Sequence, residues 1–287
     1  MNSFSKLHPV NLFCFYTFLI MISVFLQNPF YQCVSAIGGG MFLCCLQGVK
    51  KGVKKIASCV FFGAVIAVLN PLFSHNGITP LFFINDSAYT LEALVCGCGL
   101  ALSVISVILW FATFNTVFDS EKSLYLFGKI SPKLSMLFSM VLGFVPRLLS
   151  GYKEILSVQK NFCKKPGLRL YIDCFSAVIT HSLEDTVDMS DSMTARGFGR
   201  KNPTVFSRFK FDLRDGFFLF LFLAFTGTVI LPCFAGGVAA VYYPRIIFPD
   251  ITPTLVVSYA AFAAMCLTPF LFEVTEELKW KYSVRKI

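Results

Sequence analysis

The sequence predicts an all-α integral membrane protein, with about six transmembrane helices and a cytoplasmic domain of two or three long amphipathic helices. Of its 287 residues, 56% are hydrophobic and only 14% are charged, whereas an ordinary soluble domain is about 25% charged. Long apolar stretches recur along the chain, and one long segment that is richer in charged residues interrupts them. So much apolar surface exceeds what one soluble core can bury, and this favours a membrane protein.

Each predicted span is an apolar stretch long enough to cross a hydrocarbon core of about 30 Å. Asn28-Pro29 separates the first two, and Gly38-Gly39-Gly40 lies inside the second, where small residues permit close helix contact. The six stretches are approximately residues 9–27, 30–48, 56–73, 88–111, 215–235 and 253–273.

Basic residues predict the orientation. The run KKGVKK (50–55) joins the second and third spans, and residues 112–214 hold fifteen Lys and Arg, whereas residues 236–252 hold only Arg245. With both termini inside, 24 of the 25 basic residues are cytoplasmic, as the positive-inside rule expects. The net charge of +9 is explained in this way without nucleic acid. We expect a multi-pass protein of a prokaryotic plasma membrane, with both termini and residues 112–214 in the cytoplasm.

The spans divide the chain into three predicted domains. Residues 1–111 form an N-terminal membrane domain of four spans, and residues 215–287 form a C-terminal membrane domain of two spans with a short basic cytoplasmic tail. Residues 112–214 are long enough for a separate cytoplasmic domain. Helix caps and prolines in this segment predict three helices, at about 120–130, 132–163 and 168–196. The second begins at Pro132, after Ser131 as its cap.

The second of these helices is ambiguous, because residues 132–149 have the length of a seventh span. Lys133, Gly143, Pro146 and Arg147 weigh against one. A further crossing would also place Arg196 outside unless another crossing followed. We therefore expect a long helix along the inner face of the membrane, kinked near Pro146.

The third helix is amphipathic and ends in the motif MTARGFG (193–199). Apolar residues such as Phe175 and Val187 recur at the helical period, with Asp173 and Asp188 on the other side. Gly197 predicts the helix end. A simple interpretation makes Arg196 a cation favoured by the helix dipole, by about 0.3–1 kcal/mol. The alternative is a docking tip, in which small neighbours let the planar donor fork of Arg196 enter a cleft of a soluble partner.

Several runs, in order, resemble a known family. TARGFG resembles the second Ala-Arg-Gly signature of the transmembrane T component of energy-coupling factor (ECF) transporters, the EcfT/CbiQ family. LHPVNLFCFY (7–16) resembles the family's N-terminal start, and NPLFSHNG (70–77) resembles a run found in some T components. Residues 109–148 resemble the passage into the coupling helices. The resemblance covers approximately residues 7–214, and the last two spans match only in hydrophobic character.

The resemblance implies a function and its partners. T components are membrane scaffolds of ATP-driven importers of vitamins or metal ions, and two cytoplasmic coupling helices each dock one of two ABC-type ATPase subunits. A small membrane S component binds the substrate. By this resemblance Ala195, Arg196 and Gly197 contact one ATPase, while ATP and Mg²⁺ are bound by the ATPases. The chain itself is expected to be non-catalytic, with no cofactor and no metal of its own.

The first docking motif departs from the family pattern. The corresponding positions, which we call the first slot, are Gln159, Lys160, Asn161, Phe162 and Cys163. In this alignment Phe162 replaces the central arginine. Lys160, Lys164 or Lys165 would substitute electrostatically, or Phe162 would fill an apolar patch. Two explanations of this departure stay open. The two ATPase subunits differ from each other, or the chain is a diverged paralogue that still assembles with them.

The motifs that the sequence lacks help to choose between the possible classes of membrane protein. The sequence has no G-x-x-x-x-G-K-[ST] run, so a P-loop in this chain is not expected, and its Cys and His lack zinc or iron–sulfur spacing. An ATPase-independent secondary transporter is the main alternative, but Glu92 is the chief ionisable residue in the spans. An intramembrane enzyme based on Glu276-Glu277 lacks supporting histidines. A transporter half that binds substrate itself stays open.

Overall fold

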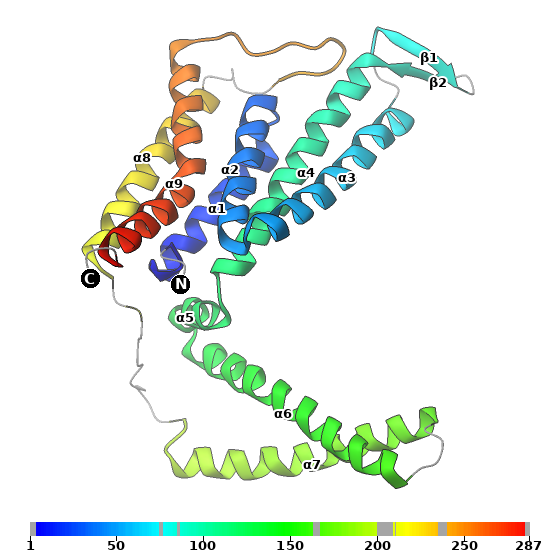
Figure 1. Ribbon diagram of the computed structural model, residues 1–287, viewed down its shortest axis with the longest axis vertical. Coiled ribbons are helices and arrows are strands. Elements are labelled where there is room, and N and C mark those ends of the chain that lie inside the picture. The colour runs from blue at the N-terminus through cyan, green and yellow to red at the C-terminus, as the bar shows by residue number, and fades with distance from the viewer. Residues whose placement is uncertain are drawn as a thin grey trace. The chain divides into compact units, whose positions relative to one another are not determined.

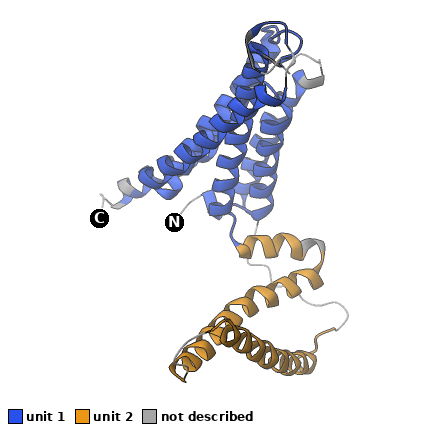
Figure 2. Cartoon of the chain, turned by 90° about the vertical axis from the view of Figure 1, so that its right-hand side faces the viewer, with its two compact units in different colours: residues 1–119, 209–287 blue, residues 120–208 orange. Residues whose placement is uncertain are grey.

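The computed structural model describes residues 4–74, 77–84, 87–162, 167–199, 209, 211–234 and 240–284. It is 85% helical, which confirms the predicted helical class. The chain forms two compact units (Figure 2): unit 1 comprises Met1–Asp119 and Phe209–Ile287, and unit 2 comprises Ser120–Arg208. The N-terminal and C-terminal apolar helices therefore pack into one body, with unit 2 inserted between them in the sequence.

Unit 1 contains six α-helices in its described part. Two of them begin at clear side-chain caps: the Asn28 side chain accepts a hydrogen bond from the Phe30 amide, and the Thr90 side chain accepts one from the Ala93 amide. A short 3-10 helix, η1 (Phe4–Lys6), precedes them. The six are α1 (Pro9–Phe25), α2 (Pro29–Gln47), α3 (Val49–Phe73), α4 (Leu91–Val117), α8 (Leu213–Phe234) and α9 (Pro253–Val284).

Helix α2 lies in the middle of unit 1 and packs against α1, α3, α4 and α9 (Figure 1). Helix α4 also packs against α1 and α3, and α9 also packs against α8. Aromatic side chains fill the core between these helices. The Phe4 ring meets the rings of Phe15, Phe42 and Phe218 edge to face or nearly so, and Trp110 is fully buried beside Phe15. The core thus joins residues from both ends of the chain.

The glycines of α2 mark its closest contacts. A Cβ added at Gly38 would lie 2.9 Å from the Cys266 Cβ of α9, and one at Gly39 would lie 3.3 Å from the Leu109 Cβ of α4. This confirms the predicted close approach of helices at Gly38-Gly39-Gly40.

Six helices of the described residues are long and apolar enough to span a membrane: α2, α3, α4, α6, α8 and α9. This fits a multi-pass membrane protein, and five of them lie at predicted spans. The predicted first span corresponds to α1, which is a shorter apolar helix of 17 residues. Helix α6 (Pro132–Phe162), which we expected along the inner face, meets the criteria of length and composition. Its placement along the membrane surface therefore stays a prediction.

The connection between α3 and α4 contains a short hairpin that the sequence did not predict. Strands β1 (Pro80–Ile84) and β2 (Ser87–Thr90) pair antiparallel. Span four was predicted to begin at residue 88, but α4 begins at Leu91 because Thr90 caps it. Glu92, the chief ionisable residue predicted in the spans, accepts a hydrogen bond of 2.8 Å from the Thr79 hydroxyl.

Unit 2 consists, in its described part, of α5 (Ser120–Ile130), α6 and α7 (Leu168–Ala195). These bounds match the three helices predicted between residues 112 and 214. Pro146 lies inside α6, which continues through it. Helix α6 packs against both α5 and α7.

Candidate functional site

Helix α7 is held to α6 by a small contact area. Its buried side chains are Cys174 and Val178, which lie one helical turn apart on one face. A cleft of about 540 Å³ lies beside them between the two helices. Because so little of α7 is buried, most of the helix surface is available to a partner.

Much of the apolar surface of unit 2 is exposed. On α7, Ile172, Phe175 and Leu183 are each at least half exposed. A contiguous apolar helix surface of this kind is typical of an interaction site rather than of an isolated soluble domain. Exposed large apolar residues are also found along α6: Leu134, Met136, Leu137, Phe138, Val141, Leu142, Val145, Leu149, Val158 and Phe162.

The C-terminus of α7 forms a Schellman cap around the predicted motif. The Gly197 amide donates to the carbonyl oxygen of Thr194, and the Phe198 amide donates to that of Met193, both at 3.0 Å. Gly197 adopts a left-handed conformation with φ of 86°, which glycine tolerates best. This confirms the predicted helix end and explains the glycine of the Ala-Arg-Gly triplet.

Arg196 is the C-cap residue of α7, with φ of −81° and ψ of 2°. Ala195, Arg196 and Gly197 are all exposed. Among the described residues no carboxylate forms an ion pair with Arg196. The backbone of Arg196 therefore belongs to a hydrogen-bonded helix end, and its side chain is exposed to solvent. The arrangement suits either a dipole-favoured cap or a docking tip.

The first slot lies at the end of the α6–α7 pair that is opposite to Arg196. Gln159, Lys160, Asn161 and Phe162 form the exposed last turn of α6, and the Phe162 side chain is 81% exposed. The Lys160 ammonium lies 5.6 Å from the ring centroid of Tyr171, near the start of α7. Cys163, Lys164 and Lys165 lie outside the described residues.

The structure does not bring the two slots together. Tyr171 marks the position of the first slot along α7, and Arg196 lies 25 residues further along the same chain. At 1.5 Å per residue this separates them by about 40 Å. The two ends therefore do not form one composite site.

The cleft between α6 and α7 contains charged residues that sequence reasoning missed. Arg147 and Glu154 of α6 line it together with His181 and Asp185 of α7. His181 Nδ1 also lies 3.9 Å from Glu184 Oε2. The spacing of His181 and Asp185 at i and i+4 was a usable signal of a shared face, but nothing in the sequence showed that it faces α6.

The described residues contain no cluster of three or more His, Cys, Asp or Glu side chains able to hold a metal ion. The sequence matches no protein-family model, and it matches none of the curated proteins with which it was compared. The site must therefore be interpreted from its own geometry.

Proposed function

We propose that this chain is the membrane scaffold, or T component, of an ECF-type ATP-driven importer. In this role it transmits conformational change from two ABC-type ATPase subunits to a separate S component that binds a vitamin or a metal ion. The observation that carries the proposal is the end of α7. An exposed arginine at a Schellman-capped helix terminus, between alanine and glycine, has the shape and chemistry to enter an ATPase groove.

The rigidity of that end supports a mechanical role. A docking residue transmits force only if its own backbone does not yield. The three amide hydrogen bonds that end α7, donated by Arg196, Gly197 and Phe198, hold the motif against the last helical turn. Movement of a bound ATPase would therefore be passed to the whole of α7 rather than absorbed in a loop.

The exposed apolar surface of α6 and α7 supports an S component as the second partner. A small apolar membrane protein would cover residues such as Phe175 and Leu183, whose exposure is costly in water. In the proposed cycle, ATP binding closes the two ATPases and moves the ends of α6 and α7. These helices then tilt the S component, which releases its substrate inside.

The two docking ends differ in chemistry. Arg196 offers a charged fork, whereas the first slot offers the exposed Phe162 ring, with Lys160 engaged on Tyr171. We infer that the two ATPase grooves differ correspondingly, one polar and one apolar. A heterodimeric pair of ATPases fits this difference better than a homodimer does.

Purification from the native cell tests the proposal. The tagged full chain is extracted in several mild detergents with nucleotide present, and co-purifying proteins are identified by mass spectrometry. Two P-loop ATPases and a small hydrophobic protein are expected, and the last points to the substrate. Recovery of the chain alone in all conditions would instead favour a transporter that works without ATPases, and Arg196 would then be only a helix cap.

A further inference from the structure

Helix α3 packs on only one of its sides, against α2 and α4. A Cβ added at Gly52 would lie 2.7 Å from the Cys44 Sγ of α2, and one added at Gly63 would overlap the Ile105 side chain of α4. Cys59, which is also buried, lies between these two glycines on the same side of the helix. The opposite side of α3 is exposed along the whole helix.

That exposed side changes from basic to apolar along the helix axis. Because a helix turns by about 100° per residue, Lys50, Lys54, Phe61, Val65 and Val68 fall within about 60° of one another, and all five are exposed. We call this side the α3 lysine face. A second exposed row lies beside the first and has the same pattern, consisting of Lys51, Lys55, Phe62, Leu69 and Phe73.

The apolar part of the face has the length of a bilayer core. Residues 56–73 contain no Asp, Glu, Lys or Arg, and they extend over about 27 Å, close to the hydrocarbon thickness of about 30 Å. Lys55 directly precedes this segment. The four lysines therefore lie at the depth of lipid headgroups, and the exposed apolar side chains face acyl chains.

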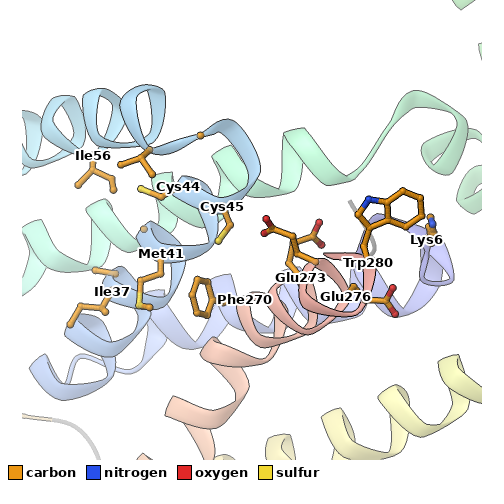
Figure 3. A pocket seen from close by; sticks show the side chains of 15 residues that line it. Lys6, Ile37, Met41, Cys44, Cys45, Ile56, Phe270, Glu273, Glu276 and Trp280 are labelled. Atoms are coloured by element: carbon orange, nitrogen blue, oxygen red, sulfur yellow. The ribbon is translucent and has the colours of Figure 1, made fainter. Parts of the chain in front are cut away.

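Protein carboxylates do not neutralise these lysines. Among the described residues, none of the four forms an ion pair. A groove of about 1260 Å³ between α2 and α9 contains Glu273 and Glu276 (Figure 3), and α3 lines it with Val49 and Ile56. Those two residues lie about 140–160° around the helix from Lys54. The acidic groove is therefore on a different side of α3 from the lysine face.

The start of α3 makes this uncompensated charge unfavourable. Cations near a helix N-terminus are disfavoured by the helix dipole, and like charges at i and i+4, such as Lys50 with Lys54, repel each other. The first turn has no acidic residue, and Gly48 at the N-cap provides no side-chain hydrogen bond. A phosphate group would offset both the lysine charges and the positive end of the helix dipole.

We propose that the α3 lysine face binds a phospholipid of net negative charge, such as phosphatidylglycerol. Its phosphate lies beside Lys50 and Lys54, and an acyl chain lies along Phe61 and Val65. A zwitterionic lipid has the same phosphate but brings a cation close to the lysines, so it binds less well. The face belongs to α3 and not to α6 or α7, and its occupation does not depend on the proposed function.

Lipid retention after reconstitution in nanodiscs tests this assignment. The full chain is reconstituted in equal parts of phosphatidylglycerol, phosphatidylethanolamine and phosphatidylcholine, extracted in mild detergent, and its retained lipid is quantified by native mass spectrometry. We expect phosphatidylglycerol to be enriched about fivefold or more over each of the other two. The enrichment should decrease as the salt concentration rises, because salt screens the lysine–phosphate attraction.

Three variants separate the lysine face from a general effect of charge. Lys50→Gln/Lys54→Gln should bring the retained lipid close to the equal mixture, whereas Lys50→Arg/Lys54→Arg keeps both charges and should keep the enrichment. Lys6→Gln/Lys279→Gln removes the same charge from η1 and α9 and should leave the enrichment unchanged.

Four results would overturn the proposal. Retention by the unmodified protein could mirror the equal mixture, or enrichment could persist unchanged in Lys50→Gln/Lys54→Gln. The control variant could lose as much enrichment as that variant does. Inorganic phosphate could raise the melting temperature as much as phosphatidylglycerol does, which would indicate an ion site without a lipid. If the glutamine variant folds poorly, the salt dependence of the unmodified protein decides, and enrichment that is insensitive to salt contradicts the assignment.

Discussion

The amide of Phe198 donates a hydrogen bond to the carbonyl oxygen of Met193, with an N···O distance of 3.0 Å. This bond crosses the left-handed Gly197 and closes the last turn of α7. It converts a three-residue sequence motif into a rigid structural feature with Arg196 at its tip. The functional proposal therefore depends on a local geometry that can be altered one residue at a time.

Replacement of Gly197 tests that geometry. Gly197→Ala places a Cβ on a residue with φ of 86°, which costs about 1–2 kcal/mol, and we expect the end of α7 to fray. Hydrogen exchange of the Phe198 amide should accelerate by about an order of magnitude. Gly197→Asn is the matched control, because asparagine tolerates this conformation, and it should exchange more slowly than the alanine variant. Equal exchange in both variants would show that the cap does not hold the helix end.

The proposed docking role of Arg196 is tested by measuring ATPase binding. Arg196→Glu removes the donor fork and adds a repulsive charge, so ATPase affinity should fall by at least about 2 kcal/mol, or roughly thirtyfold. Arg196→Lys keeps the charge without the planar fork and should show an intermediate loss. Binding and uptake are measured in proteoliposomes. Arg245→Glu, an exposed charge reversal outside α6 and α7, is the control and should behave like the unmodified protein.

Phe162 tests whether the first slot is an apolar contact. Its side chain is 81% exposed in the isolated chain, and full burial of a phenylalanine contributes about 1.5–3 kcal/mol. Phe162→Ala should therefore weaken binding of one ATPase by about tenfold or more. Phe73→Ala removes an equally exposed ring, 84% exposed, from the end of α3 and should have no effect. Unchanged binding of both ATPases to Phe162→Ala would remove this residue from the interface.

The contact between α2 and α9 is tested at Gly38. An alanine Cβ would lie 2.9 Å from the Cys266 Cβ and 3.2 Å from its carbonyl oxygen, so Gly38→Ala must separate the helices. We expect a loss of about 1–3 kcal/mol, seen as a lower apparent melting temperature in a fixed detergent. Gly143→Ala has open space around the added methyl group and is the control. It should be neutral or stabilising, since alanine favours a helix over glycine.

The core hydrogen bond of α4 is tested at Trp110. Its indole Nε1–H donates to Ser35 Oγ at 2.9 Å, and Ser35 in turn lies 2.8 Å from Ser23 Oγ. Trp110→Phe loses this bond and part of a fully buried ring, which should cost about 1–3 kcal/mol. Trp280→Phe changes the other tryptophan, which is 71% exposed. A melting temperature that falls equally in both variants would argue against a structural role of the Trp110–Ser35 pair.

Much of the secondary structure was accessible from the sequence. The signals at Asn28-Pro29, Ser131-Pro132 and Gly197 are local, because a cap or a proline acts within one helical turn. They placed the helix ends of α1, α2, α6 and α7 within a few residues. The hairpin of β1 and β2 was missed because both strands are short and the run PLFFI does not alternate apolar and polar residues, so no strand periodicity marks it.

The sequence alone could not show which apolar residues are buried in the core. In a membrane protein, side chains that face lipid and side chains that face another helix are both apolar, so periodicity does not separate them. Phe15 is buried and Phe13 is 40% exposed, although they lie two residues apart in the same apolar run. The groove lined by Ile37 of α2 and Glu273 of α9 was hidden for a different reason, because these two residues are more than 200 positions apart in the sequence.

By itself, the sequence determined the helical class, the pattern of apolar helices, the end of α7 and the position of Arg196 at that end. These depend on composition and on interactions within a turn or two of helix. Only the tertiary structure decided that the N-terminal and C-terminal helices form one unit, that Gly38 meets Cys266, and that three glutamates of α9 face an apolar groove. Those features depend on which helices meet, and contacts between distant segments are specified by shape and close packing, which no local pattern records.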